Sequence, residues 1–431
     1  MLDHFGLEIE KLIEKSGVRK VFTPHAPVQI QELLFGRSGA VKQIIKQINN
    51  PGAYPILYGD RGVGKTSIAS IVQAVIEHSK NTLLSQFKST FISQKKCSSQ
   101  ETLASIFRRV LKECLVDIDL LESTQSEESG GNAGIAAGFA NAGVASKRNK
   151  TEKKASPESR ISPSYLAELL SKKFSFGLLI VDEVDAIKDP SVKYQLAETI
   201  KLLSDSHSTF KVMLVGVAEL SETLTNGHPS IGRCAVEIKI ERMKDPEIKQ
   251  IITTGAMRIK PPMDFDDDVT KRIVQLANGY PYFAHLIALK CVEDALAENR
   301  KHIRVHHLPS ALISATSEAE QTLRSTFDAA TSSATTNMYR VVVDAASRFG
   351  VENFSAADLR RKIQEINEKS ITQGALNNLF KKLVDDNHEC ILHRVAKGTY
   401  RFSDPRMPSF VKIVCESKVH YPNKEDLSEK H

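Results

Sequence analysis

The clearest chemical signal in the sequence is the segment Gly59-Asp-Arg-Gly-Val-Gly-Lys-Thr66. It fits the pattern GxxxxGK[ST], in which glycines let the backbone turn so that its N–H groups face phosphate oxygens. Lys65 is expected to hold the β- and γ-phosphates, and the Thr66 hydroxyl to complete the coordination of Mg²⁺. The positive end of the following helix adds to this attraction. The pattern predicts an ATP–Mg²⁺ site formed by Gly59, Asp60, Arg61, Gly62, Val63, Gly64, Lys65, Thr66 and Ser67.

A second candidate element is the apolar run Leu178-Leu-Ile-Val181, which ends in Asp182 and Glu183. Such a run can be a plain strand end, but here it follows the glycine-rich loop with two β/α elements between them. Asp182 is then expected to bind the metal, and Glu183 to orient or deprotonate the water that attacks the γ-phosphate. Lys65 and Glu183 would thus be catalytic residues of an ATPase, an enzyme that hydrolyses the phosphoanhydride bond of ATP.

The segments around these residues alternate between short apolar runs and helical periodicity. This order predicts an α/β core with a parallel sheet that helices cover on both faces. Ser162 and Pro163 are suited to begin one of the helices as N-cap and first residue. The strands are expected at 54–58, 87–93, 176–183, 210–217 and 236–240, and the helices at 66–78, 102–120, from 163, and near 195–205.

Composition and periodicity divide the chain into five segments. Residues 122–160 are rich in Gly, Ala and Ser and then in basic residues, so we expect a flexible insertion. A small hairpin that begins at Ile135–Phe139 and reaches DNA or a neighbouring subunit is the alternative. The segments are an N-terminal helix and strap (1–50), the α/β core (51–244), an all-helical part with helices at about 246–260, 267–277, 281–299 and 307–330 (245–331), a C-terminal module (332–417) and a tail (418–431).

The C-terminal module shows three helical patterns followed by a hairpin, an order that resembles a winged helix-turn-helix. The helices are expected at Met338–Phe349, from Ser355 with Leu359, Ile363 and Ile366 inward, and from Thr372. Asn and Gln can pair with adenine edges and Lys or Arg with phosphates, so double-stranded DNA is the expected partner; use for protein contacts alone is the alternative. The candidate DNA-binding residues are Gln373, Asn377, Asn378, Lys381, Lys382, Arg394 and Lys397, with His393 and Arg401 beside them.

The overall composition excludes several classes of protein. A formal charge of +6 over 431 residues permits contact with nucleic acid but does not require it. The six cysteines are scattered without a CxxC pair, so we expect reduced thiols rather than a disulfide or metal framework. We find no apolar run long enough for a membrane span and no secretory h-region, which favours a cytoplasmic or nucleoid-associated protein without a membrane partner.

Two of these motifs resemble those of AAA+ ATPases. Asp182-Glu-Val-Asp185 resembles their acidic motif, and Leu34-Phe-Gly-Arg37 resembles their adenine-side motif, which adds Phe35, Gly36 and Arg37 to the nucleotide-binding residues. The resemblance implies a parallel-sheet P-loop NTPase core, a helical lid at 245–312 and a C-terminal winged-helix domain. This order is similar to that of the origin-recognition initiator ATPases and of bacterial transposition-type ATPases. It implies a homo-oligomer that binds ATP between subunits and assembles on DNA, in replication, transposition or defence against mobile elements.

The sequence departs from the AAA+ pattern at two places. The strand that begins at Val212 reaches Glu219 without the polar residue that usually senses the γ-phosphate at its tip. In the lid, Asn278-Gly-Tyr-Pro281 replaces the usual arginine and resembles the Gly-x-Pro signature of STAND signalling ATPases, with Pro281 at the nucleotide. The alternative function is therefore a STAND-like nucleotide-dependent switch that uses the C-terminal module to contact a protein partner.

Three further residues could act at the nucleotide or could have purely structural roles. The segment from His228 to Arg233 resembles the one that carries the arginine finger of AAA+ ATPases, which implies that Arg233 acts at a neighbouring subunit's γ-phosphate. Arg242 is the second candidate, and an ordinary surface arginine is the alternative for both. His285 follows Pro281 by one helical turn, and we expect a packed histidine there rather than a nucleotide ligand.

Overall fold

The computed structural model describes residues 7–28, 34–79, 89–114, 161–217, 229–333, 336–350, 352–367, 371–384 and 390–417. The expected insertion at 122–160 with its alternative hairpin, the end of the helix expected at 102–120, the tail 418–431, Glu219 and His228 lie outside these residues. The chain forms two compact units, which we describe separately. The sheet unit comprises 42–58 and 72–239, and the helical unit comprises 1–41, 59–71 and 240–431.

The sheet unit is built on a five-stranded sheet with the order β2-β3-β4-β1-β5. The pairs β2–β3, β3–β4 and β1–β4 are parallel, as the alternating sequence pattern predicted. Every residue of β3 and β4 is buried, which is the reason that both strands are mostly apolar. The exception within β4 is Lys211, whose Nζ donates hydrogen bonds to the carbonyl oxygens of Asn50 at 2.8 Å and Ala53 at 3.1 Å. The strands are β1 (Tyr54–Gly59), β2 (Thr90–Lys96), β3 (Phe176–Asp182), β4 (Phe210–Gly216) and β5 (Ala235–Ile240).

Strand β2 was expected to end at Ser93 but continues to Lys96. The reason is its register with β3, in which Thr90 pairs with Phe176 and Lys96 with Asp182. Pairing with a fully buried neighbour holds the polar residues Gln94-Lys-Lys96 in the strand, although their composition alone does not indicate one. The polar end of β2 therefore reaches the same edge of the sheet as the acidic end of β3.

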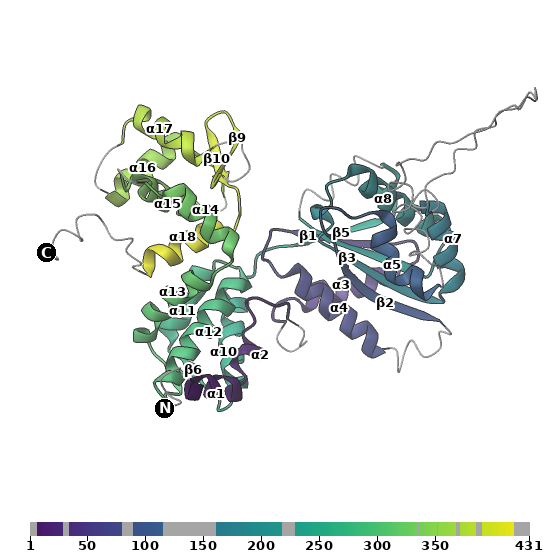
Figure 1. Ribbon diagram of the computed structural model, residues 1–431, viewed down its shortest axis with the longest axis horizontal. Coiled ribbons are helices and arrows are strands. Elements are labelled where there is room, and N and C mark those ends of the chain that lie inside the picture. The colour runs from purple at the N-terminus through teal and green to yellow at the C-terminus, as the bar shows by residue number, and fades with distance from the viewer. Residues whose placement is uncertain are drawn as a thin grey trace, which may run out of the picture. The chain divides into compact units, whose positions relative to one another are not determined.

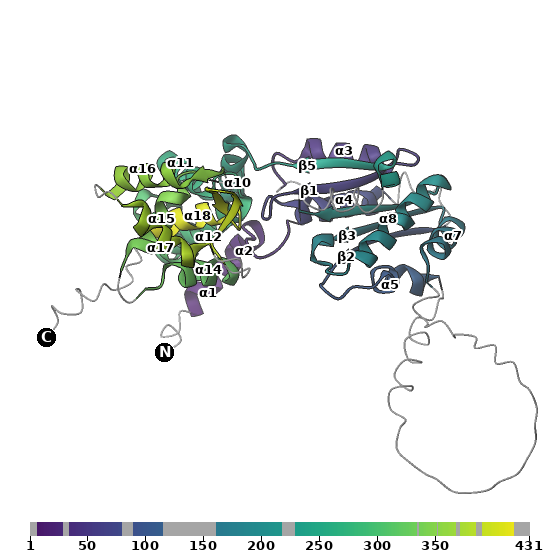
Figure 2. The same ribbon diagram turned by 90° about the horizontal axis from the view of Figure 1, so that it is seen from above.

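Helices cover both faces of the sheet, as expected. On one face, α5 (Leu103–Glu113), α7 (Pro163–Lys173) and α8 (Pro190–Asp205) share a hydrophobic core with alternate residues of β3 and β4. Helices α3 (Ser38–Ile48) and α4 (Lys65–Ser79) cover the other face (Figures 1 and 2). Helix α7 begins as predicted, because the Ser162 hydroxyl accepts a hydrogen bond from the Tyr165 N–H at 3.2 Å and Pro163 follows it.

The helical unit contains the lid, whose centre is α12 (Pro281–Ala297) with most of its residues buried. The prediction that strands vanish beyond Asp245 is wrong: β6 (Asp264–Phe265) and β7 (His302–Ile303) form a parallel pair. Strands of two residues leave no periodicity to detect. Around them lie α1 (Leu7–Ser16), α2 (Val18–Val21), α10 (Asp245–Arg258), α11 (Asp267–Ala277), α13 (Leu308–Glu318) and α14 (Gln321–Thr331).

The helix expected at 307–330 is interrupted between α13 and α14. Ala319 and Glu320 have extended backbones, and the Glu320 N–H donates to the Tyr282 hydroxyl at 2.8 Å instead of to a helical carbonyl. This partner lies 38 residues away in the chain, so local periodicity could not indicate the break. Within the described ranges, no helix combines the length and the apolar character needed to cross a membrane.

The C-terminal module has the three expected helices and hairpin, and adds a strand and a helix that we did not predict. Strand β8 (Phe354–Ser355) joins the hairpin in an antiparallel sheet of order β8-β10-β9. Ile366 was expected inward but is 38% exposed. Helix α18 (Met407–Glu416) packs against α11, α13 and α14 as well as α15, so it joins the module to the lid. The remaining elements are α15 (Met338–Ser347), α16 (Ala356–Asn367), α17 (Gln373–Leu383), β9 (Leu392–Ala396) and β10 (Thr399–Phe402).

His285 is a packed histidine, as expected. It is 5% exposed, its Nδ1 accepts a hydrogen bond from the Thr23 N–H at 3.3 Å, and burial lowers its pKa to about 4. This pKa lies below the ordinary value of 6.5, so burying the neutral ring contributes fully to the free energy of unfolding above pH 6.5. The contribution is lost as the pH falls toward 4.

We therefore expect the protein to lose about 2 kcal/mol of unfolding free energy between pH 7 and pH 5 through His285. The variant His285→Gln keeps an acceptor for the Thr23 N–H but does not titrate. Its free energy of unfolding should therefore fall less than that of the wild type between pH 7 and pH 5. Urea unfolding at both pH values measures the difference. His393→Gln, on the exposed strand β9, is the control. An equal loss in wild type and His285→Gln would contradict the prediction.

Candidate nucleotide site

The glycine-rich loop between β1 and α4 uses backbone angles that favour glycine. Gly59, Gly62 and Gly64 have φ angles of +154°, +83° and +95°. A Cβ atom at Gly59 would also collide with the carbonyl oxygen of Ile240. Helix α4 begins directly at Lys65, so the loop leads into a helix N-terminus. Loops of this shape can present N–H groups to an anion, which is the role that the motif predicts.

Lys65 is held inside this loop. Its Nζ donates hydrogen bonds to the carbonyl oxygens of Gly59 at 2.9 Å and Asp60 at 2.7 Å. These bonds fix the ammonium group above the backbone that is expected to bind phosphate. Its side chain is partly buried, so the charge is less screened than that of a surface lysine. The geometry therefore places one fixed positive charge at the loop.

Arg37, expected on the adenine side, supports the loop from behind. Its Nη2 donates to the carbonyl oxygens of Val63 at 3.0 Å and Glu241 at 2.8 Å, and burial lowers its pKa. Gly36 has a φ of +65° and packs so closely on Glu247 that a Cβ atom would overlap the carboxylate. The hydrogen bonds of Arg37 thus help to fix the shape of the loop. Phe35, two residues earlier, is half-buried.

Ser67 also has a bond within the protein. Its hydroxyl accepts a hydrogen bond from the Val28 N–H at 3.1 Å, which ties the N-terminal strap to the first turn of α4. Pro281, at the start of α12, lies near the loop as well, because a Cβ atom at Gly64 would be 3.9 Å from its Cγ. The structure thus brings the strap, the glycine-rich loop and the start of α12 together within the helical unit.

The acidic pair lies at the end of β3 in the sheet unit. Asp182 is 2% exposed, and its two carboxylate oxygens accept hydrogen bonds from the Glu183 N–H at 2.9 Å and from Gln94 Nε2 at 3.2 Å. Glu183 has a φ of +56°, an uncommon angle for a residue other than glycine. Lys96 forms an ion pair with Glu183 at 2.9 Å. Functional sites are where such strained backbone angles concentrate.

Gln94 and Lys96 are candidate site residues that the sequence analysis missed. Both lie on β2, and Lys96 is directly opposite Asp182 in the register. The signal was present in the sequence as the polar end of a strand that precedes the acidic strand. It was not usable, because nothing in the sequence alone states that β2 neighbours β3.

The strand order relates the two motifs. Strands β1 and β3 both pair with β4 in parallel, so their carboxyl ends lie at the same edge of the sheet. Strand β1 leads into the glycine-rich loop, and β3 ends in the acidic pair. In open α/β sheets, ligands bind at this edge. A parallel sheet, a loop that presents N–H groups and an acidic strand end together define the class of P-loop nucleotide-binding proteins.

Comparison with known proteins finds a family model that is similar to the core. Residues 51–224 match the family model described as "AAA domain". The α/β core of this chain is therefore similar to an AAA domain, and its parallel sheet fits the fold of an AAA+ P-loop core. Among curated proteins, none gives a significant sequence match.

Solved structures with similar folds include archaeal and bacterial proteins. The Walker-type ATPase paby2304 of Pyrococcus abyssi is 15% identical, with 91% of this chain and 99% of that chain covered and a TM-score of 0.48. The Aeropyrum pernix ORC1 protein in complex with DNA is 15% identical, with 96% and 97% covered and a TM-score of 0.49. The Thermotoga maritima RuvB Holliday junction branch migration motor is 12% identical, with 87% and 95% covered and a TM-score of 0.41.

The two arginine candidates have different surroundings. Arg233 ends a short 3-10 helix, η5 (Pro229–Arg233); its side chain is 76% exposed, 3.8 Å from Asp205. Arg242 instead lies over the Tyr280 ring, with its guanidinium carbon 5.6 Å from the ring centre. Arg233 is thus accessible to another molecule, whereas Arg242 packs on its own lid.

One cluster of metal-binding residue types occurs in the described part of the chain, formed by Glu298, His306 and His307. His307 Nδ1 accepts a hydrogen bond from the Arg304 N–H at 2.9 Å, so in the neutral ring the proton is on Nε2, which lies 3.2 Å from Glu298. A metal at Nε2 would require the opposite tautomer. These residues form a hydrogen-bonded cluster rather than a metal site.

Proposed function

We propose that this chain is an ATPase that binds and hydrolyses ATP–Mg²⁺ and uses the nucleotide to control its assembly on duplex DNA. The observation that carries the first part is the loop conformation, with φ positive at Gly59, Gly62 and Gly64 and Lys65 fixed inside it. We assign phosphate binding to the backbone of Gly59–Ser67, and we place Phe35, Gly36, Arg37 and Pro281 around the nucleotide. We expect the protein in the cytoplasm or at the nucleoid.

The chemistry follows from the residues at the sheet edge. Asp182 and the Thr66 hydroxyl would hold Mg²⁺, which neutralises charge on the phosphate oxygens when it is bound. Lys65 stabilises the negative charge that develops in the transition state. Glu183 accepts a proton from the attacking water or orients it. Lys96 forms an ion pair with the Glu183 carboxylate at 2.9 Å.

Assembly into a homo-oligomer would complete the catalytic site. Arg233 is largely exposed, and its ion-pair partner Asp205 lies 3.8 Å away. An exposed ion pair of this length contributes little to stability, so Arg233 can leave it at small cost. We assign Arg233 to the γ-phosphate of a neighbouring subunit, where a planar guanidinium stabilises the transition state.

The DNA surface that we propose is the exposed face of α17 together with the β9–β10 hairpin. All seven candidate residues are exposed, but three contacts reduce the set that can reach DNA directly. Lys382 donates to the Ser332 carbonyl and lies 4.8 Å from the Tyr339 ring, and Gln373 donates to Asn377 at 3.0 Å. We therefore assign phosphate contacts first to Lys381 and Lys397, and base contacts to Asn378.

The double variant Lys381→Glu/Lys397→Glu tests this surface. We expect duplex DNA to raise ATP turnover of the wild type in a salt-sensitive manner. In the double variant, affinity for DNA should fall roughly tenfold or more, and the salt dependence of binding should decrease by about two phosphate contacts. Fluorescence anisotropy at several salt concentrations measures both. The control Lys271→Glu/Lys301→Glu reverses two exposed lysines of the lid. Equal affinity in all three proteins would contradict the assignment.

The second candidate function is a nucleotide-dependent switch of the STAND type that contacts a protein partner. The position of Pro281 beside Gly64 favours it, because that arrangement lets the lid respond to the loop. ATP turnover that ignores DNA, together with a wild-type protein that does not bind duplex DNA, would support the switch. Turnover that rises with DNA would favour the first function, in a setting of replication, transposition or defence against mobile DNA.

A further inference from the structure

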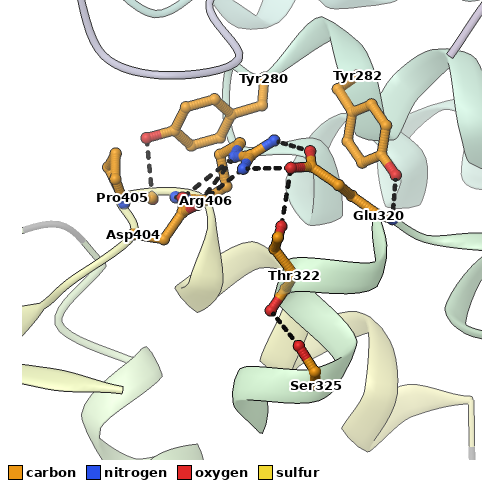
Figure 3. Close-up of polar contacts among 8 residues, drawn as sticks. All are labelled: Tyr280, Tyr282, Glu320, Thr322, Ser325, Asp404, Pro405 and Arg406. Atoms are coloured by element: carbon orange, nitrogen blue, oxygen red, sulfur yellow. Dashed lines mark hydrogen bonds and ion pairs between the residues drawn. The ribbon is translucent and has the colours of Figure 1, made fainter. Parts of the chain in front are cut away.

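An ionic cluster around the buried Arg406 side chain joins the C-terminal module to the junction between α13 and α14 (Figure 3). The Arg406 side chain is 4% exposed, and all three guanidinium nitrogens have carboxylate partners. Nη2 donates to Asp404 at 2.7 Å and Nη1 donates to Glu320 at 2.5 Å. Burial alone would lower the pKa of Arg406, but these two carboxylates outweigh it and raise that pKa. Arg406 is therefore permanently charged.

The same side chain lies against the glycine-rich loop. A Cβ atom at Gly62 would be 2.6 Å from Arg406 Cδ and 3.3 Å from Cγ. The Arg406 side chain of the C-terminal module is thus in contact with Gly62 of the glycine-rich loop. Arg61, the preceding residue, is close enough to help lower the pKa of Glu320, although burial of Glu320 acts in the opposite direction. The Arg406 side chain therefore lies next to the loop that would hold the phosphates.

The tyrosines on either side of Pro281 hold this cluster in place. The Tyr280 hydroxyl donates to the Pro405 carbonyl oxygen at 2.9 Å, and the Tyr282 hydroxyl accepts from the Glu320 N–H at 2.8 Å (Figure 3). Glu320 is the N-cap residue of α14, at the break between α13 and α14, and its side chain accepts hydrogen bonds from Arg406. The cluster is thus built by the lid, the α13–α14 junction and the C-terminal module together.

Two carboxylates, Asp404 and Glu320, share the single Arg406 guanidinium, and Arg61 also acts on Glu320. A phosphate bound at Gly62 would add negative charge beside this cluster and repel the carboxylates. A guanidinium binds phosphate and carboxylate oxygens with the same planar geometry, so either anion can take it.

We propose that Arg406 is a phosphate-binding residue of the nucleotide site, supplied by the C-terminal module, and that Glu320 competes with the bound phosphate for its guanidinium. Occupancy of the loop by ATP would draw Arg406 from Glu320 and so loosen the bond between the module and the lid. The C-terminal module would thereby register whether the loop is occupied. This inference rests on the proposed function, because it requires polyphosphate at the glycine-rich loop.

If phosphate and Glu320 compete for the Arg406 guanidinium, removing the guanidinium and removing the Glu320 charge should have opposite effects on ATP–Mg²⁺ affinity. Arg406→Met removes the guanidinium and should weaken ATP–Mg²⁺ binding roughly 10- to 100-fold, the range for a charge-assisted hydrogen bond. Glu320→Gln removes the competing charge with almost no change in shape. It should tighten ATP–Mg²⁺ binding roughly three- to thirtyfold, the range for one charge removed at several ångströms. Isothermal calorimetry with ATP–Mg²⁺ on the full chain measures both constants.

A second arginine–glutamate pair provides the matched control. Arg272 of α11 donates to Glu416 of α18 at 2.6 Å, so it also ties the lid to the C-terminal module, but through a different helix pair. Arg272→Met should leave ATP affinity unchanged. An equal loss of affinity in Arg272→Met and Arg406→Met would mean that a loosened module is the cause, and would overturn the proposal.

The remaining outcomes separate this inference from the proposed function. Loss of binding in Lys65→Ala with wild-type affinity in Arg406→Met would keep the nucleotide site and refute the role of Arg406. Absence of ATP binding in the wild type would refute both. If Arg406→Met does not fold, Glu320→Gln still decides: unchanged or weaker ATP binding by this variant would end the proposal. Tighter binding would support it.

Discussion

Replacing Lys65 with alanine is expected to weaken ATP–Mg²⁺ binding by about 2–5 kcal/mol, roughly 30- to 5,000-fold. The reason is that Lys65 carries the charge that the loop fixes in place, through bonds to the carbonyl oxygens of Gly59 and Asp60 at 2.9 and 2.7 Å. In Lys65→Ala these two carbonyls keep their orientation toward the loop interior. They would then face the anionic phosphates without an intervening cation. The variant therefore loses an attraction and gains a repulsion.

Calorimetry with ATP–Mg²⁺ measures this effect directly, without dependence on turnover or on DNA. Lys46→Ala is the matched control, because Lys46 is an exposed lysine of α3 away from the loop. It should bind ATP as the wild type does. The bonds of Lys65 also stabilise the empty loop, so thermal unfolding should accompany the titration. Tight ATP binding by a folded Lys65→Ala protein would refute the proposed nucleotide site and every role assigned to residues around it.

Glu183→Gln is expected to retain ATP binding and lose turnover by roughly 10²- to 10⁴-fold, the usual contribution of a general base. Glutamine has nearly the same shape as glutamate but cannot accept a proton. The variant also breaks the charge pairing with Lys96, which is an exposed contact with side chains 68% and 43% accessible. Pairs of this kind contribute little to stability, so the fold should be unaffected.

Two measurements separate the chemical step from binding. Calorimetry should give an ATP affinity within a fewfold of the wild type, whereas phosphate release should be nearly abolished. Glu113→Gln, at the exposed end of α5, is the control and should turn over ATP normally. If ATP accumulates on the blocked variant, subunit assemblies should persist longer in size-exclusion chromatography with ATP. Wild-type phosphate release by Glu183→Gln would remove Glu183 from the catalytic role.

The sequence by itself determined the α/β class and most elements of the core. Buried parallel strands are mostly apolar, so β3 and β4 were recognisable, and Ser162-Pro163 marked the start of α7 because capping is a local property. The glycine-rich loop was recognisable for the same reason: its chemistry depends on residue types within eight positions. These features are local, and local features survive in a one-dimensional pattern.

Only the tertiary structure decided which segments meet. The extension of β2 to Lys96, and with it the contacts of Gln94 and Lys96 to the acidic pair, depends on the pairing of β2 with β3. The break at Glu320 depends on Tyr282, and the approach of Arg406 to Gly62 joins positions more than 300 residues apart. Such contacts arise from strand order and from packing between distant helices. No periodicity or spacing records them, because they are properties of the assembled chain.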